Sequence, residues 1–298
     1  MKPIIGVEIL DIENLDAVSR HVMYLDIKTH SQKGTPMPQW DPTAYLAFSG
    51  ERSRPFLDLI ARVPGDPAAI VDLGCGPGHL MPVLRARWAG ARICGVDSSS
   101  EMVDRADREN NDPLVTYVQG DIASWVPDAA VDLLVSNAAF QWVPDQLDVI
   151  PRLRQHVASG GTLAFQAPNN SDAPSHTLLA ELASDPRFRR HTEGVASARG
   201  VDARTYLDLL ADSDWSLDVW TTTYLHVLAG EDAVFRWISG TGARPYLQAL
   251  PDDLRPVFEA DYRAALRETY PRSEHGTVLP FERVFVVAIR EPGSVDRP

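Results

Sequence analysis

Three glycines occupy five successive positions in the segment VDLGCGPGHL, residues 71–80, directly after an apolar run. An apolar run that ends near an acidic residue and leads into a glycine-rich turn and a helical pattern predicts a strand, a turn and a helix. Open backbone and a helix N-terminus then meet at the carboxyl edge of a sheet, where open α/β sheets bind ligands. We therefore expect Gly74, Gly76 and Gly78 to lie against a ligand.

The chain around this loop alternates strand-like and helix-like patterns. Apolar runs recur at 69–74, 92–97, 115–120, 131–137 and 161–167, and helical patterns near 78–88, 99–109 and 146–157 separate them. This alternation is typical of parallel strands joined by right-handed crossovers, and the unbroken apolar runs suit a sheet covered on both faces. Later runs near 215–225 and 281–290 are expected to pair antiparallel at one edge. The prediction is an α/β fold, a doubly wound Rossmann-like sheet of seven strands, mostly parallel with one antiparallel edge strand.

The remaining sequence predicts an organisation in four parts. Residues 1–38 form an N-terminal extension that could act as a lid, and residues 39–168 form the ligand-binding core. Residues 169–280 form a mixed segment that contributes a helical cap and a late core strand. Residues 281–290 form the closing core strand.

Charge and cysteine content exclude several classes of partner. The formal net charge of −13 at pH 7 argues against a nucleic-acid or anionic-membrane surface. The apolar runs are too short to span a bilayer, and acidic residues appear too early for a signal peptide, so we expect a cytoplasmic protein. The two cysteines make neither a disulfide framework nor a metal-ligand spacing, and we expect no metal site.

Two carboxylates narrow the class of ligand. The glycine spacing departs from the dinucleotide pattern G-x-G-x-x-G, because position 79 is His, and the Gly-Lys-Ser/Thr ending of a phosphate loop is absent. Asp72 flanks the loop and Asp97 ends the second strand. Carboxylates suit ammonium and ribose hydroxyl groups better than phosphates, which indicates S-adenosylmethionine. Asp97 would accept hydrogen bonds from the ribose, and Asp72 or the loop carbonyls would receive the ammonium through a water.

Further cofactor contacts are expected where other strands end. After the third strand, Asp121 would accept from the adenine amine and the Ile122 backbone would read the ring. After the fourth strand, Asn137 and Ala138 would offer carbonyls beside the sulfonium. The predicted cofactor set is completed by residues in the loop and after the second strand: Cys75, Ser98 and Met102.

The chain also resembles the class I S-adenosylmethionine-dependent methyltransferases, and more narrowly the trans-aconitate methyltransferase group. The resemblance is carried by WDPTAYLAFSGERSRPFLDLIARV, VDLGCGPG, GVDSSSEM, NAAFQWVPD, VWTTTYLHVL, TGARPYLQAL and VFVVAIR. It covers about residues 40–290, whereas 1–38 do not match the usual start of the group. It implies the seven-stranded methyltransferase sheet and methyl transfer to a carboxylate oxygen of trans-aconitate or a related small polycarboxylic acid.

Such an acceptor needs no general base, because a carboxylate is already ionised at neutral pH. Alignment in a dry pocket must supply the acceleration, since an anion and a cation become neutral products. Arginine pairs bidentately with the other carboxylates of a polyacid. The candidates for binding the acceptor are arginines with nearby hydroxyl and imidazole donors: Arg244, Arg52, Arg54, Tyr224 and His226.

Three more side chains complete the predicted acceptor site. Tyr45 shares a helical face with Phe48 and Arg52, and that face could close over the ligand. Gln141 and Trp142 follow the fourth strand, where side chains line the site.

Two other functions fit parts of this pattern. A natural-product O- or C-methyltransferase would usually want a positioned base for a neutral acceptor, and no His/Asp pair stands out as one. A non-catalytic S-adenosylmethionine-binding protein would not require a cap that contains several arginines and aromatic residues.

Overall fold

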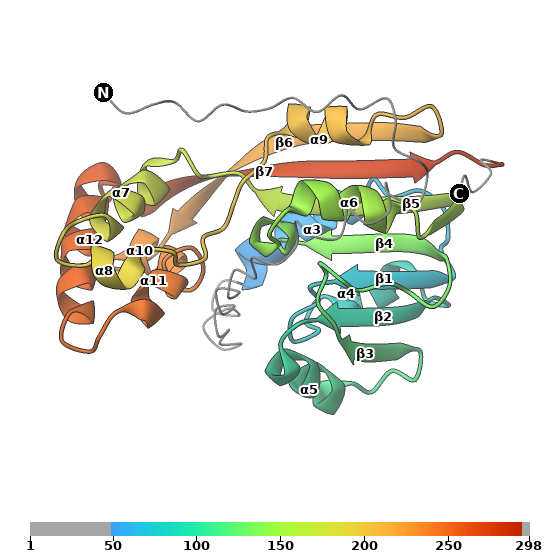
Figure 1. The fold of residues 1–298 in the computed structure, drawn as a ribbon, viewed down its shortest axis with the longest axis horizontal. Helices are drawn as coiled ribbons and strands as arrows, with labels where there is room; N and C mark the ends of the chain where they lie inside the picture. The colour runs from blue at the N-terminus through green and yellow to red at the C-terminus, as the bar shows by residue number, and fades with distance from the viewer. Residues whose placement is uncertain (1–48, 294–298) are drawn as a thin grey trace, which may run out of the picture. The chain divides into compact units, whose positions relative to one another are not determined.

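The computed structural model describes residues 49–293, with side chains from Ser53 onward. Within this range seven strands form one sheet in the order β3-β2-β1-β4-β5-β7-β6 (Figure 1). Their bounds are β1 (Ala69–Leu73), β2 (Arg92–Asp97), β3 (Val115–Gln119), β4 (Val131–Asn137), β5 (Val157–Pro168), β6 (Trp215–Leu228) and β7 (Thr277–Arg290). The predicted α/β sheet is confirmed: β7 is antiparallel to both β5 and β6 at one edge, and the other pairings are parallel.

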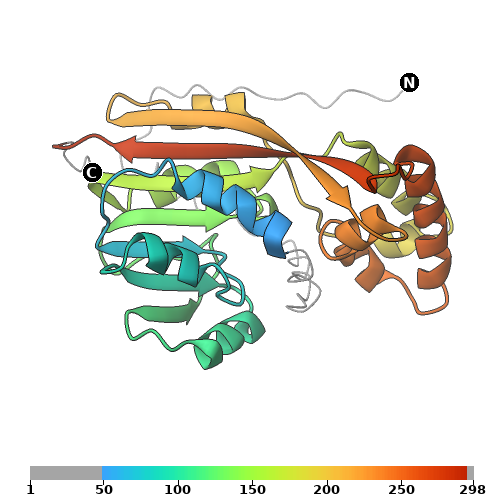
Figure 2. The same ribbon diagram turned by 180° about the vertical axis from the view of Figure 1, so that it is seen from behind.

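Helices cover both faces of the sheet. On one face lie α3 (Ser49–Ile60) and α4 (Met81–Arg87) (Figure 2); Phe56 and Leu59 of α3, which contacts β5 and β7, share an apolar cluster with Leu84 of α4 and with residues of β1, β2 and β4. On the other face lie α6 (Gln146–Arg154) and α9 (Ala203–Leu210) (Figure 1), and their Ile150 and Tyr206 share an apolar cluster with residues of β4, β5 and β7. This two-sided burial explains why the strands are apolar throughout.

The predicted helix near 78–88 begins later, at Met81. Gly74, Gly76 and Gly78 all have φ between +55° and +76°, a left-handed conformation that no helix continues through, so the loop extends to residue 80. The next helix, α5 (Ser100–Glu109), agrees with its prediction, because the Ser99 hydroxyl accepts from the Met102 amide and caps its first turn.

The segment between β5 and β7 folds as a helical cap around one end of β6 and β7. Its helices are α7 (Pro174–Ala183), α8 (Arg189–Thr192), α10 (Ala233–Ser239), α11 (Arg244–Ala249) and α12 (Arg255–Thr269). Trp237 of α10 and Tyr262 of α12 share one apolar cluster with Leu228, Leu279 and Phe281 of the two strands. Buried residues of β6 and β7 therefore form part of the apolar core of the cap.

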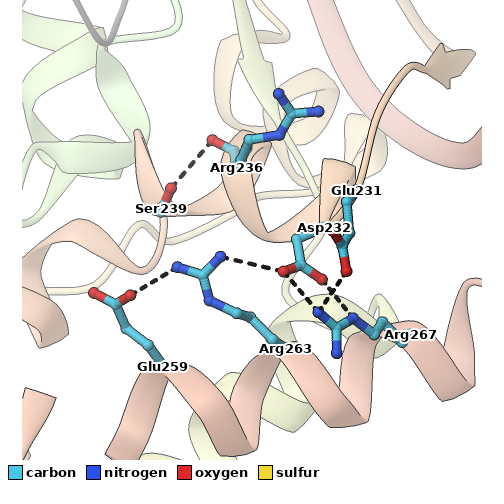
Figure 3. Close-up of polar contacts among 7 residues, drawn as sticks. All are labelled: Glu231, Asp232, Arg236, Ser239, Glu259, Arg263 and Arg267. Carbon is cyan, nitrogen blue, oxygen red and sulfur yellow. Dashed lines mark hydrogen bonds and ion pairs between the residues drawn. The ribbon is translucent and has the colours of Figure 1, made fainter. Parts of the chain in front are cut away.

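Ion pairs join Asp232, the residue before α10, to α12 inside this cap (Figure 3). The Asp232 carboxylate accepts from Arg267 Nε at 2.6 Å and from Arg263 Nη1 at 3.3 Å, and Arg263 also pairs with Glu259. Asp232, Arg263 and Arg267 border a hollow of about 260 Å³. Because both arginines are paired with carboxylates here, we assign the cluster to cohesion of the cap.

The described residues contain no helix long and apolar enough to cross a membrane. Between residues 49 and 293, no three histidine, cysteine, aspartate or glutamate side chains are grouped to hold a metal ion.

Candidate functional site

The glycine loop after β1 is packed tightly at two positions and open at a third. A Cβ atom on Gly74 would overlap the Cβ of Ala139, and one on Gly78 would lie 2.5 Å from the Tyr117 hydroxyl. A Cβ on Gly76 would meet no atom within 4 Å. The loop is thus pressed against Tyr117 of β3 and against Ala139 after β4, while a Cβ on Gly76 would point into open space.

Asp97, at the end of β2, holds this loop. Its Oδ2 accepts from the Gly76 amide at 2.9 Å, and its Oδ1 accepts from the Ser99 amide at 2.9 Å. Burial raises the pKa of Asp97, and these two hydrogen bonds oppose that shift. The Met102 side chain, in the first turn of α5, is buried, and the Ser98 carbonyl accepts from Gln119 Nε2.

Asp72 is a buried carboxylate in β1, with 1% of its surface exposed. Its Oδ1 atom has no hydrogen-bond partner among the described residues. Burial, and then the charge of Asp97, raise the pKa of Asp72 to about 7. A buried acceptor without a donor costs free energy, so this oxygen suits a ligand that brings an ammonium group or an ordered water. The chemistry of the site therefore fits the predicted cofactor.

The other predicted cofactor residues lie around the same strand ends. Asp121 follows β3 and accepts from the Ala123 amide, which closes a tight turn. The buried Ile122 side chain lies 3.5 Å from the position of a Gly74 Cβ. Cys75 is buried in the apolar cluster beneath the loop, and burial, followed by the charges of Asp72 and Asp97, raises the pKa of its thiol.

The end of β4 is conformationally strained. Ala138 has φ +54°, a left-handed conformation that is unusual for a residue with a side chain. Its carbonyl accepts from Gln141 Nε2 at 2.5 Å, and its amide donates to the Gln166 carbonyl. The preceding Asn137 is buried, and its Oδ1 accepts from Gln166 Nε2 at 2.5 Å. Such strain concentrates at functional sites, where surrounding bonds hold it in place.

On the acceptor side, the structure brings three predicted residues together. Tyr224 and His226 alternate along β6, both are buried, and their rings stack with centroids 6.1 Å apart. The Tyr224 hydroxyl donates to Asp58 Oδ2 at 2.7 Å, and the Arg54 guanidinium lies 5.4 Å from the Tyr224 ring. Burial and the Asp58 carboxylate raise the pKa of Tyr224, so the phenol stays protonated.

The other residues predicted to bind the acceptor lie in separate elements of the fold. Gln141 and Trp142 lie in a 3-10 helix, Phe140–Trp142, directly after β4. Arg244 is the first residue of α11 in the cap. Arg52 lies in α3, but its side chain is outside the described part, as are Tyr45 and the extension 1–38.

Sequence analysis missed three residues near these positions. Asp58 lies one helical turn after Arg54, at a spacing that could have indicated the pair. Gln166 in β5 and Arg283 in β7 are buried polar residues, and Arg283 Nη1 donates to Gln166 Oε1 at 2.9 Å. A polar residue inside an otherwise apolar strand was the available signal.

Comparison with known proteins identifies relatives across most of the chain. A family model described as "Methyltransferase domain" matches residues 71–165. Trans-aconitate 2-methyltransferase of Streptomyces coelicolor is 47% identical, over 86% of this chain and 88% of that protein. The protein of the same name from Azoarcus sp. is 45% identical, over 85% of this chain and 100% of its own length, and that of Escherichia coli O157:H7 is 40% identical.

Among solved structures, the YcgJ protein from Bacillus subtilis has a similar fold. Its TM-score is 0.50 at 15% identity, and the match covers 82% of this chain and 100% of that one.

Proposed function

Because this chain belongs to the family of trans-aconitate 2-methyltransferases, we propose that it methylates a carboxylate oxygen of trans-aconitate or a related small polycarboxylic acid. It is a methyltransferase, and its cofactor is S-adenosylmethionine. One observation carries the proposal for the acceptor. The identity of 40–47% extends over 85–86% of the chain, far beyond the common domain at 71–165, and so includes most of the acceptor side.

We assign the cofactor to the carboxyl ends of β1 to β4. The backbone at Gly76 leaves room for it, Asp97 would accept from the ribose hydroxyls, and the orphaned Asp72 oxygen would receive the ammonium through a water. Asp121 and the Ile122 backbone would read the adenine, and the Ala138 carbonyl would lie beside the sulfonium. When bound, the cofactor supplies an electrophilic methyl group on a positively charged sulfur.

The chain's own residues would bind and orient the acceptor and exclude water from it. Since a carboxylate is ionised at neutral pH, no residue needs to remove a proton. Arg54, Arg52 and Arg244 are the proposed partners of the acceptor's other carboxylates, with Tyr45, Gln141 and Trp142 closing the site. Tyr224 and His226 are the proposed hydroxyl and imidazole donors; their rings stack, the His226 and Trp237 ring centroids lie 4.5 Å apart at a tilt, and the three rings together would form an aromatic wall. A wall that excludes water favours a step in which opposite charges are neutralised.

The proposal is tested by supplying the protein with labelled S-adenosylmethionine and a panel of acids. We expect methyl ester from trans-aconitate, and none from its trimethyl ester, which offers the same skeleton without an ionised oxygen. Citrate and a monocarboxylic acid of similar size test how many carboxylates are required. Methylation of a hydroxyl or carbon acceptor with every acid inert would contradict the proposed acceptor class.

Replacing Asp97 with alanine is expected to weaken binding of S-adenosylhomocysteine, the demethylated product. The variant loses an acceptor for the ribose and also the hydrogen bonds to Gly76 and Ser99 that shape the loop. Loss of hydrogen bonds to a charged acceptor costs about 1.5–3 kcal/mol, and titration calorimetry measures it. Asp107→Ala, at an exposed carboxylate on α5, is the matched control. Wild-type affinity in Asp97→Ala would remove Asp97 from the cofactor site.

A further inference from the structure

Three buried polar side chains cross the sheet where β4, β5 and β7 meet the site. Asn137 ends β4 and is paired in register with Gln166 of β5. Arg283 of β7 is in register with Pro168, two residues further along β5. Their exposed fractions are 7%, 0% and 3%. They lie at the same strand ends as Ala138 and the residues assigned to the cofactor.

Hydrogen bonds connect the three side chains in one direction. Arg283 Nη1 donates to Gln166 Oε1 at 2.9 Å, and Gln166 Nε2 donates to Asn137 Oδ1 at 2.5 Å. A guanidinium group donates and never accepts, so it requires the oxygen of Gln166 on its side. The Gln166 nitrogen must then face β4, where it requires the oxygen of Asn137. The charge of Arg283 thereby sets the orientation of two planar amides.

The consequence falls on the nitrogen of Asn137. Because Asn137 Oδ1 accepts from Gln166, Asn137 Nδ2 points away from Gln166. No described residue accepts a hydrogen bond from Asn137 Nδ2. Asn137 lies between β1 and β5, and ligands bind where the order of parallel strands reverses, here between β1 and β4. A cation at the far end of the chain also polarises both amides, which strengthens the terminal N–H as a donor.

We propose that Arg283 is a positioning residue: acting through Gln166, it orients the Asn137 amide so that its NH2 group donates to a carboxylate bound at the site. That carboxylate belongs to the acceptor or to the amino-acid part of the cofactor. If the carboxylate belongs to the acceptor, the inference rests on the proposed function. If it belongs to the cofactor, the inference rests only on the binding of S-adenosylmethionine.

Gln166→Glu separates this role from simple packing. Glutamate keeps an oxygen for Arg283 and pairs with it more strongly, but its second oxygen cannot donate to Asn137. The Asn137 amide must then reverse and turn its oxygen toward the site. If Arg283 only stabilised the fold, this variant would bind ligands normally; positioning predicts a loss. Asn137→Asp, which replaces the donor with an acceptor of equal size, is expected to give the same loss.

Arg283→Met removes the cation that sets the direction, and Arg290→Met is its control. Arg290 belongs to the same strand but lies at the opposite end of the sheet, where its Nη1 donates to the Val157 carbonyl. Calorimetry measures two affinities for each variant. The first is the affinity of the free enzyme for S-adenosylhomocysteine, and the second is the affinity for trans-aconitate of the enzyme already saturated with S-adenosylhomocysteine. Thermal unfolding confirms that each variant is folded.

We expect Gln166→Glu, Asn137→Asp and Arg283→Met to weaken one of these affinities about tenfold or more, the scale for a lost hydrogen bond to a charged group. Arg290→Met should stay within about twofold of wild type, well inside that scale. A loss confined to trans-aconitate, with a raised acceptor KM, assigns the carboxylate to the acceptor. A loss for S-adenosylhomocysteine that disappears with its decarboxylated analogue assigns it to the cofactor.

Folded Gln166→Glu and Asn137→Asp with wild-type values for both ligands would overturn the proposal, whatever the fate of Arg283→Met. Failure of the proposed function is distinct, because then wild type itself neither binds nor methylates trans-aconitate. In that case the affinity for S-adenosylhomocysteine alone decides the role of Arg283.

Discussion

Gly74→Ala is expected to destabilise the protein strongly and to abolish tight cofactor binding. The residue has φ +75°, and a left-handed conformation costs an alanine about 1–2 kcal/mol. Its new methyl group would also overlap Ala139, and relieving such overpacking costs a further 1–3 kcal/mol or so. Relieving the strained φ or the overlap with Ala139 would move the loop, which Asp97 holds through the Gly76 amide. Denaturant unfolding measures the first effect, and calorimetry with S-adenosylhomocysteine measures the second.

Gly65→Ala is the matched control for this prediction. Gly65 has φ +73°, nearly that of Gly74, but a Cβ there would meet no atom within 4 Å. It should therefore show the conformational cost without the clash, and its cofactor affinity should equal that of wild type. Equal destabilisation by the two variants would show that contact between the loop and β4 does not constrain the site.

Asp72→Asn is expected to change how stability depends on pH. The pKa of Asp72 is raised from 3.8 to about 7 in the folded state, mainly by burial. Between about pH 4 and pH 7 the folded protein therefore keeps a proton that the unfolded chain has released. The free energy of unfolding of wild type must fall as pH rises through this window, by about 1.4 kcal/mol per pH unit for this group. Asparagine has no proton to lose and lacks the effect.

The measurement is the difference in unfolding free energy between Asp72→Asn and wild type, without cofactor, at several pH values. Relative to wild type, the variant should gain about 2–3 kcal/mol between pH 5 and pH 8. Shared groups that do not interact with Asp72 cancel in this difference. A difference that stays constant with pH would show that Asp72 titrates normally in the fold.

The same carboxylate links cofactor binding to pH. An ammonium group held near Asp72 favours its ionised form and so lowers its pKa when the ligand binds. Wild type should then release a proton on binding S-adenosylhomocysteine near pH 6, which calorimetry detects as a dependence of the heat on the buffer. Asp72→Asn should show no such release.

The positions of many residues that we assign to the cofactor could be predicted from local sequence. The glycine loop, Asp97 and Asp121 each follow a short apolar run, and parallel strands bring their carboxyl ends to one edge of a sheet. The seven-stranded sheet followed from the same pattern, because strand length and burial are visible as apolar runs. Helix starts were less accurate, since the left-handed glycines delayed α4 to Met81.

The acceptor side could be predicted only as separate candidates. Tyr224 and His226 share a face because side chains alternate along a strand, and the sequence showed this. It did not show that the partner of Tyr224 is Asp58, 166 residues earlier in the chain.

The sequence by itself determined the sheet, the glycine loop and the carboxylates at its strand ends, because each depends on residues that are neighbours in the chain. Only the tertiary structure decided which buried polar groups meet. Gln166 lies 29 residues from Asn137 and 117 from Arg283. Strand order and register bring these three together, and they depend on packing over the whole sheet, which no local pattern records.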